Sequence, residues 1–405
     1  MSRIDDLIRE LCPEGVTSAA IGDRFAYEQP TKYLVQSTNY FDTGTKVLTA
    51  GQTFLLGHTR ETEGVYGAST ENPVIIFDDF TTSFQWVDFP FKAKSSAMKM
   101  ITARSTDPVE LRFLYHWMGA NRFQPTDHAR HWISVISSQR IPSLARPIQE
   151  EIVRILDTFT ELEAELEAEL EARTTQYEET RNRLMAFDAL EGHPLSGLIH
   201  ELCPEGVRSS TLGEVGTFQR GNGMEKRLLK DRGLPAIHYG EIHTRYGVWA
   251  ERTYSFVSES ETKGLREAQT GDLVIATTSE DIEGVGNAVV WLGPENAYVS
   301  GETHIFSHSQ NPKYLGYFFR SDSFQRAKLT MLTGTKVKRI SMSSLQKMGV
   351  PLPPLAVQEE IVRILDSFDA LVGDLSAGLP AEIAARRKQY EYYRDTLLTF
   401  EELAA

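Results

Sequence analysis

The stretch QEEIVRILDTF at residues 149–159 returns almost unchanged as QEEIVRILDSF at residues 358–368, with one difference in eleven positions. Two further phrases are also written twice, namely QYEETRNRLMAF at 176–187 with QYEYYRDTLLTF at 389–400, and LIRELCPEGV at 7–16 with LIHELCPEGV at 198–207. The sequence between these phrases differs from one copy to the other. Self-similarity of this kind is typical of a tandem duplication, here one in which constant segments frame unlike inserts.

Each copy of the first phrase opens an amphipathic helix. In the first copy, apolar side chains recur at steps of three and four residues, at Ile152, Ile155, Leu156, Phe159, Leu162, Leu166, Leu170, Tyr177 and Leu184. This spacing predicts one long helix from about Arg146 to Ala189 that carries a coiled-coil stripe. Such a helix would be about 60 Å long, which is too long for one globular core. It needs a partner helix, and the second copy is the evident partner.

The two long helices differ in their middle parts. In the first, Glu-Leu-Glu-Ala occurs three times from Glu161 to Ala172, so we expect the leucines to pair and the spare glutamates to form a solvated face. The second contains Gly373, Gly378 and Pro380, which predict a kink or a loop within it.

Two variable regions precede the long helices, and short β-rich runs separated by Gly, Pro, Asn and Asp are found in both. In the first region the strand-like runs are 47–51, 74–77 and 98–102, and a helix is expected at 109–118. In the second region the runs are 272–278, 287–293 and 302–307, and a helix is expected at 314–328. The order of elements repeats, so both regions are predicted to be mixed α/β domains. The expected segments are residues 1–148, 149–192, 193–357 and 358–405.

The net charge of −14 is concentrated in the helical segments. Residues 149–192 hold 13 acidic and 4 basic side chains, and residues 358–405 hold 10 and 5. These segments contain the whole acidic excess, so the two variable regions together are neutral. Nucleic-acid binding is compatible with them, but phosphate contacts would give only modest affinity without a basic partner.

The remaining composition indicates a globular protein, with 41% hydrophobic and 24% charged residues. No apolar run approaches 18 residues and the start, MSRIDDLIRE, mixes charges, so we expect neither a membrane span nor a secretory signal, and a cytoplasmic location. The only cysteines, Cys12 and Cys203, occupy the same place in two repeated phrases. A disulfide within one repeat is therefore excluded, and buried structural thiols are expected.

No pattern for catalysis or metal binding is complete. Residues 311–314 read NPKY, which resembles the Asn-Pro-Pro-Tyr motif of adenine N6-methyltransferases, but Lys313 replaces the second proline. The nearby FQRGNG at 218–223 is one residue longer than a Phe-x-Gly-x-Gly cofactor loop. The GTK at 334–336 lacks the other residues of a phosphate-binding loop, and the histidines show no metal-ligand spacing. We therefore expect neither catalysis, nor a metal, nor a cofactor in this chain.

The alternation of unlike α/β regions with near-identical helical segments resembles the specificity (S) subunits of type I restriction-modification systems. The resemblance is carried by QEEIVRILD, the acidic leucine repeat, YGEIHTRYG at 239–247 and GLPAEIAARRKQYEYYRDTLLTF at 378–400, and it covers essentially the whole chain. It implies an α/β fold class with two target recognition domains separated by two long helices that form an antiparallel coiled coil, as a pseudo-twofold tandem repeat. Each domain would read one half of a split target in double-stranded DNA.

The resemblance also implies partners. The helix pair would dock two DNA adenine methyltransferase (M) subunits, restriction and translocase (R) subunits would join for cleavage, and S-adenosylmethionine and ATP would bind to those partners. The residues expected to serve helix pairing and docking are Ile152, Ile155, Phe159, Tyr177, Ile361, Ile364, Phe368 and Tyr390. The acidic repeat, marked by Glu161, Leu162, Leu166, Leu170 and Ala172, would act as a ruler between the half-sites.

Candidates for DNA contact are basic and imidazole side chains of the variable regions, because Arg and Lys can bind phosphates or read guanine edges. They are His128, Arg130, His131, Arg220, Lys226, Arg227, Lys336, Lys338 and Arg339. For each of them an ordinary solvated charge is the alternative. Arg130 and Arg339 are the stronger candidates because they align under the shift of 209, and a shared position suits a phosphate contact better than a base contact.

Two other functions compete with DNA recognition. A coiled-coil scaffold without DNA readout would explain the helices, but it gives no purpose to two unlike α/β domains with basic closing segments. A self-contained modifying enzyme would need a cofactor site that the sequence lacks.

Overall fold

The computed structural model describes residues 3–51, 53–123, 130–187, 190, 192–372 and 378–400. The chain divides into two compact units, one formed by Met1–Leu166 with Ile383–Ala405 and the other by Glu167–Glu382. Each unit therefore combines a variable domain and its adjoining helix with a helical phrase from the other repeat. Within the ranges described, no helix combines the length and apolar character that crossing a membrane requires.

The variable domain of the first unit is built on two larger sheets. One has the order β2 (Phe25–Glu28), β8 (Met98–Ala103), β5 (Val74–Asp78) and β6 (Phe84–Val87), and the other has the order β4 (Leu55–Thr59), β3 (Thr45–Leu48) and β7 (Phe91–Ala93). All neighbours are antiparallel except β3 and β7. Its helices are α1 (Arg3–Leu11), α2 (Ile21–Arg24), η1 (Pro30–Tyr33), α3 (Pro108–Ala120), α4 (His131–Ser134) and η2 (Ile136–Ser138).

The variable domain of the second unit repeats this strand order. One sheet runs β11 (Gly216–Arg220), β20 (Thr303–His308), β16 (Leu273–Ala276), β18 (Ala288–Trp291) and β13 (Trp249–Ala250), and the other β14 (Ser255–Val257), β12 (Leu234–Ile237), β19 (Ala297–Val299) and β15 (Arg266–Ala268). Here β12 and β19 are the parallel counterparts of β3 and β7, while β13 and β15 are additional edge strands. The expectation that unlike sequences repeat one order of elements is confirmed.

The second unit also contains shorter helices and strands outside these sheets. They are α6 (Pro194–Leu202), α7 (Leu212–Val215), η3 (Lys226–Leu228), α8 (Tyr239–Thr244), η4 (Glu259–Glu261), β17 (Thr278–Ser279), α9 (Pro312–Arg320), α10 (Asp322–Leu329), β21 (Lys338–Arg339) and α11 (Met342–Gln346).

A matching glycine opens the parallel strand pair in each domain. Gly44 and Gly233 both have positive φ, 131° and 141°. A Cβ atom at Gly44 would lie 2.5 Å from the carbonyl oxygen of Thr59, and one at Gly233 would lie 2.4 Å from that of Val257. Only glycine fits both the backbone conformation and the close approach of the neighbouring strand.

Two short sheets close the domains and display the duplication directly. In the first unit β1 (Ser18–Ala20) pairs with β9 (Arg140–Pro142), and in the second β10 (Ser209–Thr211) pairs with β22 (Gly349–Pro351). Ser18 faces Pro142 in one sheet, and Ser209 faces Pro351 in the other. These residues are related by the shifts of 191 and 209 that relate the repeated phrases, so equivalent positions of the two repeats make equivalent contacts.

Most predicted elements are present, with one correction. The helix expected at 314–328 is two helices, α9 and α10. Ser321 separates them because its hydroxyl donates to the carbonyl of Phe318 and accepts the backbone N–H of Phe324, which caps α10. A serine in this position begins a new helix rather than continuing the old one.

The two long helices differ as predicted, since the first is continuous and the second is interrupted. The first is α5 (Arg146–Ala186), a continuous helix of 41 residues. The second is divided into α12 (Leu355–Val372) and α13 (Leu379–Leu397), with Gly378 and Pro380 at the start of α13. Gly373 lies outside the described residues.

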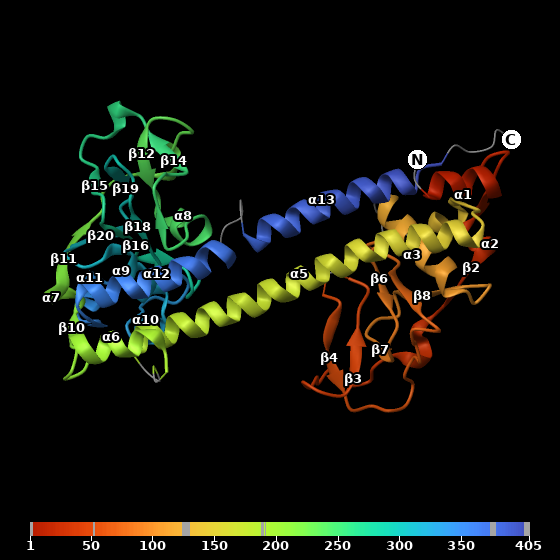
Figure 1. The fold of residues 1–405 in the computed structure, drawn as a ribbon, viewed down its shortest axis with the longest axis horizontal. Coiled ribbons are helices and arrows are strands. Elements are labelled where there is room, and N and C mark those ends of the chain that lie inside the picture. Colours follow the sequence, from red (N-terminus) through yellow and green to blue (C-terminus); the bar gives the residue numbers. More distant parts are fainter. Residues whose placement is uncertain are drawn as a thin grey trace. The chain divides into compact units, whose positions relative to one another are not determined.

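Within each unit, segments of the two repeats pack side by side, and Figure 1 shows α13 along the first part of α5 and α12 along its last part. In the first unit Phe159 stacks on Tyr393 with ring centroids 5.2 Å apart, and Glu163 pairs with Arg387. Since the residue numbers rise along α5 while they fall along α13, these helices are antiparallel. In the second unit Tyr177 of α5 stacks on Phe368 of α12 at 6.4 Å. The predicted α/β fold class with antiparallel helix pairing is confirmed.

Candidate nucleic-acid interface and partner surfaces

The second variable domain brings several predicted DNA contacts to one hollow. Arg220 ends β11, and Lys226 begins η3. Both are exposed and line a cavity of about 730 Å³ together with His238, Tyr239 and Glu302. The guanidinium group of Arg220 donates to the carbonyl of Gly301 at 3.3 Å and lies 3.7 Å from Glu302. Arg227, next to Lys226, is paired with Glu225 at 2.7 Å.

The other predicted contacts of this domain lie on a neighbouring turn. Gly334, with φ of 88°, turns the chain, and the Lys338 ammonium group donates to its carbonyl at 3.2 Å. Lys336 and Arg339 are exposed. Arg339 faces Thr278 across the β17–β21 pair.

Glu302 connects this turn to the hollow. Its carboxylate accepts the Thr278 hydroxyl at 2.7 Å and also approaches Arg220. Because Thr278 is the strand partner of Arg339, Glu302 connects the hollow of Arg220 and Lys226 to the strand pair that carries Arg339. The structure thus assembles these predicted residues from distant parts of the sequence into one polar surface.

Arg130 and Arg339 occupy equivalent places. The residue after each donates its backbone N–H to the chain beyond a central strand, His131 to Asp79 at 3.1 Å and Ile340 to Thr277 at 3.0 Å. Arg130 is exposed, as is Arg339. The alignment under the shift of 209 therefore corresponds to a shared structural position.

His131 and His128 differ from the exposed candidates. His131 is only 2% exposed, and its Nδ1 lies 3.0 Å from the carbonyl oxygen of Asp79. The Asp79 carboxylate accepts the backbone N–H of Trp132 at 2.9 Å and pairs with Lys99 at 2.9 Å. His131 therefore belongs to a buried network that holds its segment, a position that does not suit direct contact with DNA. His128 lies outside the described residues.

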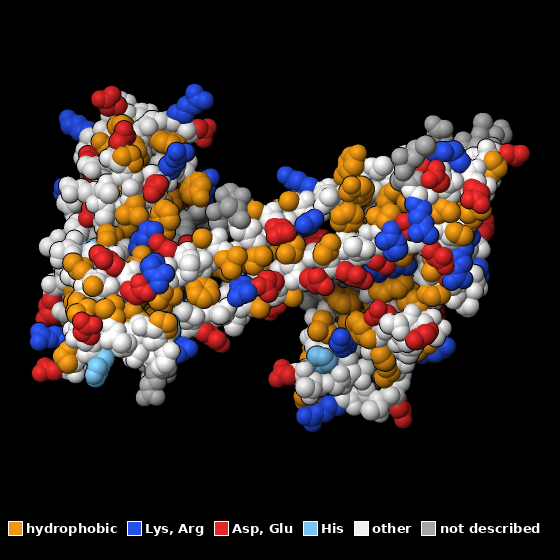
Figure 2. Space-filling model, viewed as in Figure 1, with side chains coloured by type: hydrophobic (Ala, Val, Ile, Leu, Met, Phe, Trp, Pro, Cys, Tyr) orange, Lys and Arg blue, Asp and Glu red, His pale blue; other side chains and the backbone are white. Residues whose placement is uncertain are grey.

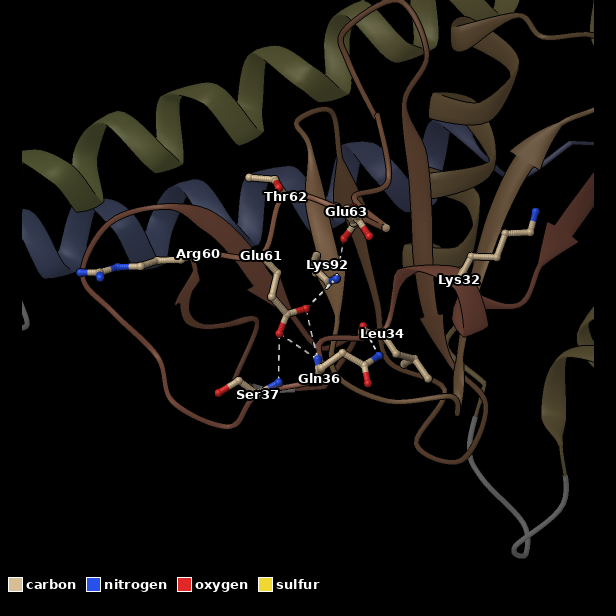
Figure 3. A pocket seen from close by; sticks show the side chains of 10 residues that line it. Lys32, Leu34, Gln36, Ser37, Arg60, Glu61, Thr62, Glu63 and Lys92 are labelled. Carbon is tan, nitrogen blue, oxygen red and sulfur yellow. Dashed lines mark hydrogen bonds and ion pairs between the residues drawn. The ribbon is translucent and has the colours of Figure 1, made fainter.

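The first variable domain has a polar hollow that the sequence did not single out. Figure 3 shows Glu61 at its centre, where the carboxylate accepts the backbone N–H groups of Gln36 and Ser37 at 3.0 Å and pairs with Lys92 at 2.7 Å. The hydrogen bond from Lys92 is the main reason that the pKa of Glu61 is lowered. Arg60, at the rim of the hollow, is exposed, and its guanidinium carbon lies 4.3 Å from the centroid of the Phe41 ring.

No repeated phrase marks this hollow in the sequence. Lys32 also lies on it, and Figure 3 shows Lys32 and Arg60 extending away from Glu61 on opposite sides. Both domains therefore present cations around a carboxylate, but with different residues.

The charge pattern agrees with the partition of the sequence. Figure 2 shows acidic side chains along the exposed face of α5, whereas the surfaces of both domains carry charges of both signs. Neutral domain surfaces with local cations can bind DNA, but they lack the strong basic field of proteins that bind it tightly alone.

The residues predicted for helix pairing and docking lie inside the units. Ile152 and Ile361 have no exposed surface and Tyr177 is 8% exposed, while Ile155, Ile364, Phe368 and Tyr390 are half-buried against the same cores and Phe159 is half-buried against Tyr393. They serve contacts within the chain. Of the ruler residues, Glu161 and Ala172 are exposed, Leu162 is 38% exposed, and Leu166 and Leu170 are half-buried. The division between the units falls between Leu166 and Glu167, within the repeats.

Exposed residues of the repeated phrases form matching surfaces on both units. Pro13 and Glu14 of one repeat are exposed, as are Pro204 and Glu205 of the other. Cys12 and Cys203 beside them are free and half-buried, not fully buried as predicted.

The start of each long helix adds a matching charged face. Arg154 pairs with Glu151 at 2.8 Å, and Arg363 pairs with Glu360 at 2.6 Å. Glu151 is 7% exposed and also lies 3.8 Å from Arg3 of α1, so in the first unit this carboxylate connects α1 to α5. Arg154 and Arg363 are both exposed, so the two repeats present the same cation at equivalent positions.

The methyltransferase-like motif has a structural role. The Asn311 side chain accepts the backbone N–H of Tyr314 at 3.2 Å and caps α9. Tyr314 is fully buried, and its hydroxyl donates to the carbonyl of Pro351 at 2.8 Å. Neither side chain is placed to hold a substrate base.

Comparison with known proteins agrees with this architecture. A family model described as the type I restriction modification DNA specificity domain matches residues 204–385. The EcoR124I/EcoR124II specificity subunit of Escherichia coli is 38% identical, covering 94% of this chain and 93% of that protein. A putative type I specificity subunit of Haemophilus influenzae is 28% identical, covering 86% of each.

Solved structures share the fold at low sequence identity. The S subunit of a type I restriction-modification system from M. genitalium has a TM-score of 0.58 at 15% identity, covering 95% of this chain and 96% of that one. A chain from a type I R-M system solved to explain complex assembly and conformational transition has a TM-score of 0.52 at 16% identity, covering 95% and 97%. Given the identity to the Escherichia coli subunit over nearly all of both chains, the protein belongs to the specificity subunits of type I restriction-modification systems.

Proposed function

We propose that this subunit recognises a bipartite DNA target, with one half-site for each variable domain. The observation that carries the proposal is the repetition of one strand order by two domains whose sequences differ. A shared framework with different surface residues is what two readers of different base sequences require, because base edges are distinguished by side chains and not by the backbone fold.

The DNA-facing surface of the second domain is proposed to be the polar surface around Glu302. Arg339, and Arg130 in the first domain, would bind phosphates, since they share one structural position. Arg220 and Lys226 lie in the hollow specific to their own domain and would contact bases or the adjoining backbone. Phosphate contacts position the protein, whereas base contacts give it sequence specificity.

The chain itself is proposed to perform no chemistry. Two adenine methyltransferase subunits would supply the S-adenosylmethionine site, and restriction and translocase subunits would supply the ATP site and cleavage. The matching exposed surfaces at Pro13–Glu14 and Pro204–Glu205, with Arg154 and Arg363, are candidate docking sites for two copies of one partner. A surface retained in both repeats, while the inserts diverge, suits the same partner twice.

Exchange of one insert tests the proposal. Replacement of residues 208–350 by the corresponding region of a relative, followed by assembly with methyltransferase subunits and sequencing of methylated sites, should change one half-site only. Exchange of residues 17–141 is the matched control and should change only the other half-site.

A change of both half-sites by either exchange would contradict the assignment of one half-site to each domain. Assembly with methyltransferase subunits but without any sequence preference would favour the alternative of a scaffold that does not read DNA.

A further inference from the structure

One carboxylate of the repeated phrase QEEIVRILD is a joint between the long helix and the variable domain in the first unit. Asp157 of α5 accepts Nε of Arg112 at 2.8 Å and lies 2.7 Å from Nε2 of His116. Arg112 and His116 are four residues apart on α3 and therefore project from one face of it. A single carboxylate thus receives two donors from successive turns of one helix.

The second unit has the same joint with different donors. Asp366 of α12, equivalent to Asp157 by the shift of 209, accepts the Lys313 ammonium group at 2.7 Å and the Tyr317 hydroxyl at 2.6 Å. Lys313 and Tyr317 are also four residues apart, on α9. The aspartate is constant, whereas each variable domain supplies its own pair of donors.

An indole supports the cation in both joints. The guanidinium of Arg112 lies 4.6 Å from the ring centroid of Trp86 on β6, and the ammonium of Lys313 lies 4.0 Å from that of Trp249 on β13. These strands are not equivalent, since β18 is the counterpart of β6. Two unlike domains therefore reach one arrangement by different routes, which a shared ancestor alone does not explain.

A tyrosine of the other repeat contacts the joint in the first unit, and its equivalent lies in the buried cluster beside the joint in the second. The Tyr390 hydroxyl of α13 lies 3.3 Å from Nδ1 of His116. Tyr177, equivalent to Tyr390 by the shift of 213, lies in the same buried cluster as Tyr317. The joint of the first unit therefore connects the variable domain to both α5 and α13.

The protonation states in the first unit favour a directional contact. Burial lowers the pKa of His116, which is fully buried, so the imidazole is neutral at neutral pH. Burial opposes ionisation of Asp157, but the bonds from His116 and Arg112 outweigh it and its pKa lies below the usual value. Because the ionised Asp157 carboxylate can only accept hydrogen bonds, the Nε2–H of His116 donates to it. The Nδ1 of the neutral ring then accepts the hydrogen bond from the Tyr390 hydroxyl. Each hydrogen bond then has one defined direction.

We propose that Asp157 and Asp366 are positioning residues that fix the angle at which each recognition domain is held on its helix pair, and so restrict the spacing between the half-sites that the complex accepts. This inference rests on the proposed bipartite recognition. Two donors from one helix to one carboxylate restrict rotation of the domain about its contact more than hydrophobic packing, which is non-directional. The apolar core beside the joint would keep the domain attached when the joint is broken.

The test uses complexes assembled with methyltransferase subunits and DNA libraries in which two fixed half-sites are separated by spacers of different length. Asp366→Asn removes the charge at nearly constant size, and Tyr317→Phe removes one donor from the domain side. We expect both variants to retain the half-site bases but to lose discrimination against spacers one base pair longer or shorter. The expected loss is about tenfold, within the range typical of one lost coupling between sites.

A matched control separates positioning from stability. Val350→Ala truncates a buried side chain of β22 in the same unit and leaves Asp366, Lys313 and Tyr317 in place. It should reduce methylation equally at all spacers. If Asp366→Asn and Tyr317→Phe behave like Val350→Ala, or keep the original spacer selectivity, the positioning role is refuted while bipartite recognition stands.

The wild-type complex shows whether a negative result counts against the positioning role or against bipartite recognition itself. If it shows no dependence on two half-sites, bipartite recognition itself has failed, and the joint has nothing to position. Should Asp366→Asn not assemble, Tyr317→Phe decides, because it deletes only a hydroxyl group and leaves the pair of Lys313 with Asp366 in place.

Discussion

Deletion of Glu165–Ala168, one Glu-Leu-Glu-Ala unit of α5, should shorten the spacer between the half-sites by one or two base pairs. Four residues correspond to about 6 Å of helix, and they turn one end of the helix relative to the other by about 40° beyond a full turn. Duplex DNA rises about 3.4 Å per base pair, so 6 Å equals at most about two base pairs. The deletion falls where the division between the units lies.

The helix should tolerate this deletion. Leu162 and Leu170 close up to the four-residue spacing that the stripe already uses, and the ion pairs of Glu163 with Arg387 and of Glu169 with Arg173 involve no deleted residue. Each of these pairs lies on one side of the deletion. We therefore expect a folded variant with the same half-site bases and some loss of affinity from the altered twist of the DNA between them.

Sequencing of the sites methylated by the assembled variant measures the spacer directly. Leu166→Ala is the matched control, because it removes the same leucine without changing the helix length, and it should leave the spacer unchanged. An unchanged spacer in the deletion variant would show that the repeats do not set the distance. Altered half-site bases would show that the ruler and the readers are not separate parts.

Three other outcomes follow from the structure. Arg339→Ala should weaken DNA binding about equally for all sequences and lower the slope of log affinity against log salt by about 1, whereas Lys347→Ala, an exposed lysine outside the proposed interface, should not; a change of preferred bases in gel-shift titrations would argue for base readout instead. Burial lowers the pKa of His308 from 6.5 to about 4, so this side chain takes up a proton more readily in the unfolded chain than in the folded protein. The free energy of unfolding should therefore keep its full value above pH 6.5 and decrease as the pH falls from 6.5 towards 4. Thermal melts at pH 7.5 and 5 should therefore show a smaller decrease for His308→Asn, whose amide oxygen can still accept the N–H of Gln310, than for the wild type; equal decreases would exclude this contribution. The purified chain with labelled S-adenosylmethionine should transfer no methyl group to DNA, and labelling at a level that survives further purification would contradict a non-catalytic role.

The duplicated phrases made the architecture predictable. The register of Ser18 with Pro142 and of Ser209 with Pro351 follows the same shifts as the phrases themselves. The division of α9 from α10 was missed because the apolar spacing continues through Ser321, and only its hydrogen bonds show that it caps a new helix.

The candidate site was harder to predict because exposure depends on tertiary packing. His131 and Arg130 are neighbours in a basic segment, yet one imidazole is buried against Asp79 while the guanidinium group beside it is exposed. The hollow around Glu61 joins residues far apart in the sequence and follows no pattern that repeats. In contrast, Arg339 was identified by alignment because its position is shared.

The joints at Asp157 and Asp366 are an intermediate case. The aspartate was visible in the repeated phrase, but its donors lie in inserts that do not align. Two polar residues four positions apart on one helix of each variable domain, α3 and α9, were the available signal. Such pairs are common on solvated helices, so only the structure distinguishes these donors.

Methylation-site sequencing of a complex assembled from this chain and two methyltransferase subunits tests bipartite recognition most directly. We predict two short, specific sequences separated by a run of unspecified bases of constant length, each altered by exchange of only one variable domain. A single uninterrupted recognition sequence, or methylation without sequence preference, would contradict the assignment of one half-site to each domain.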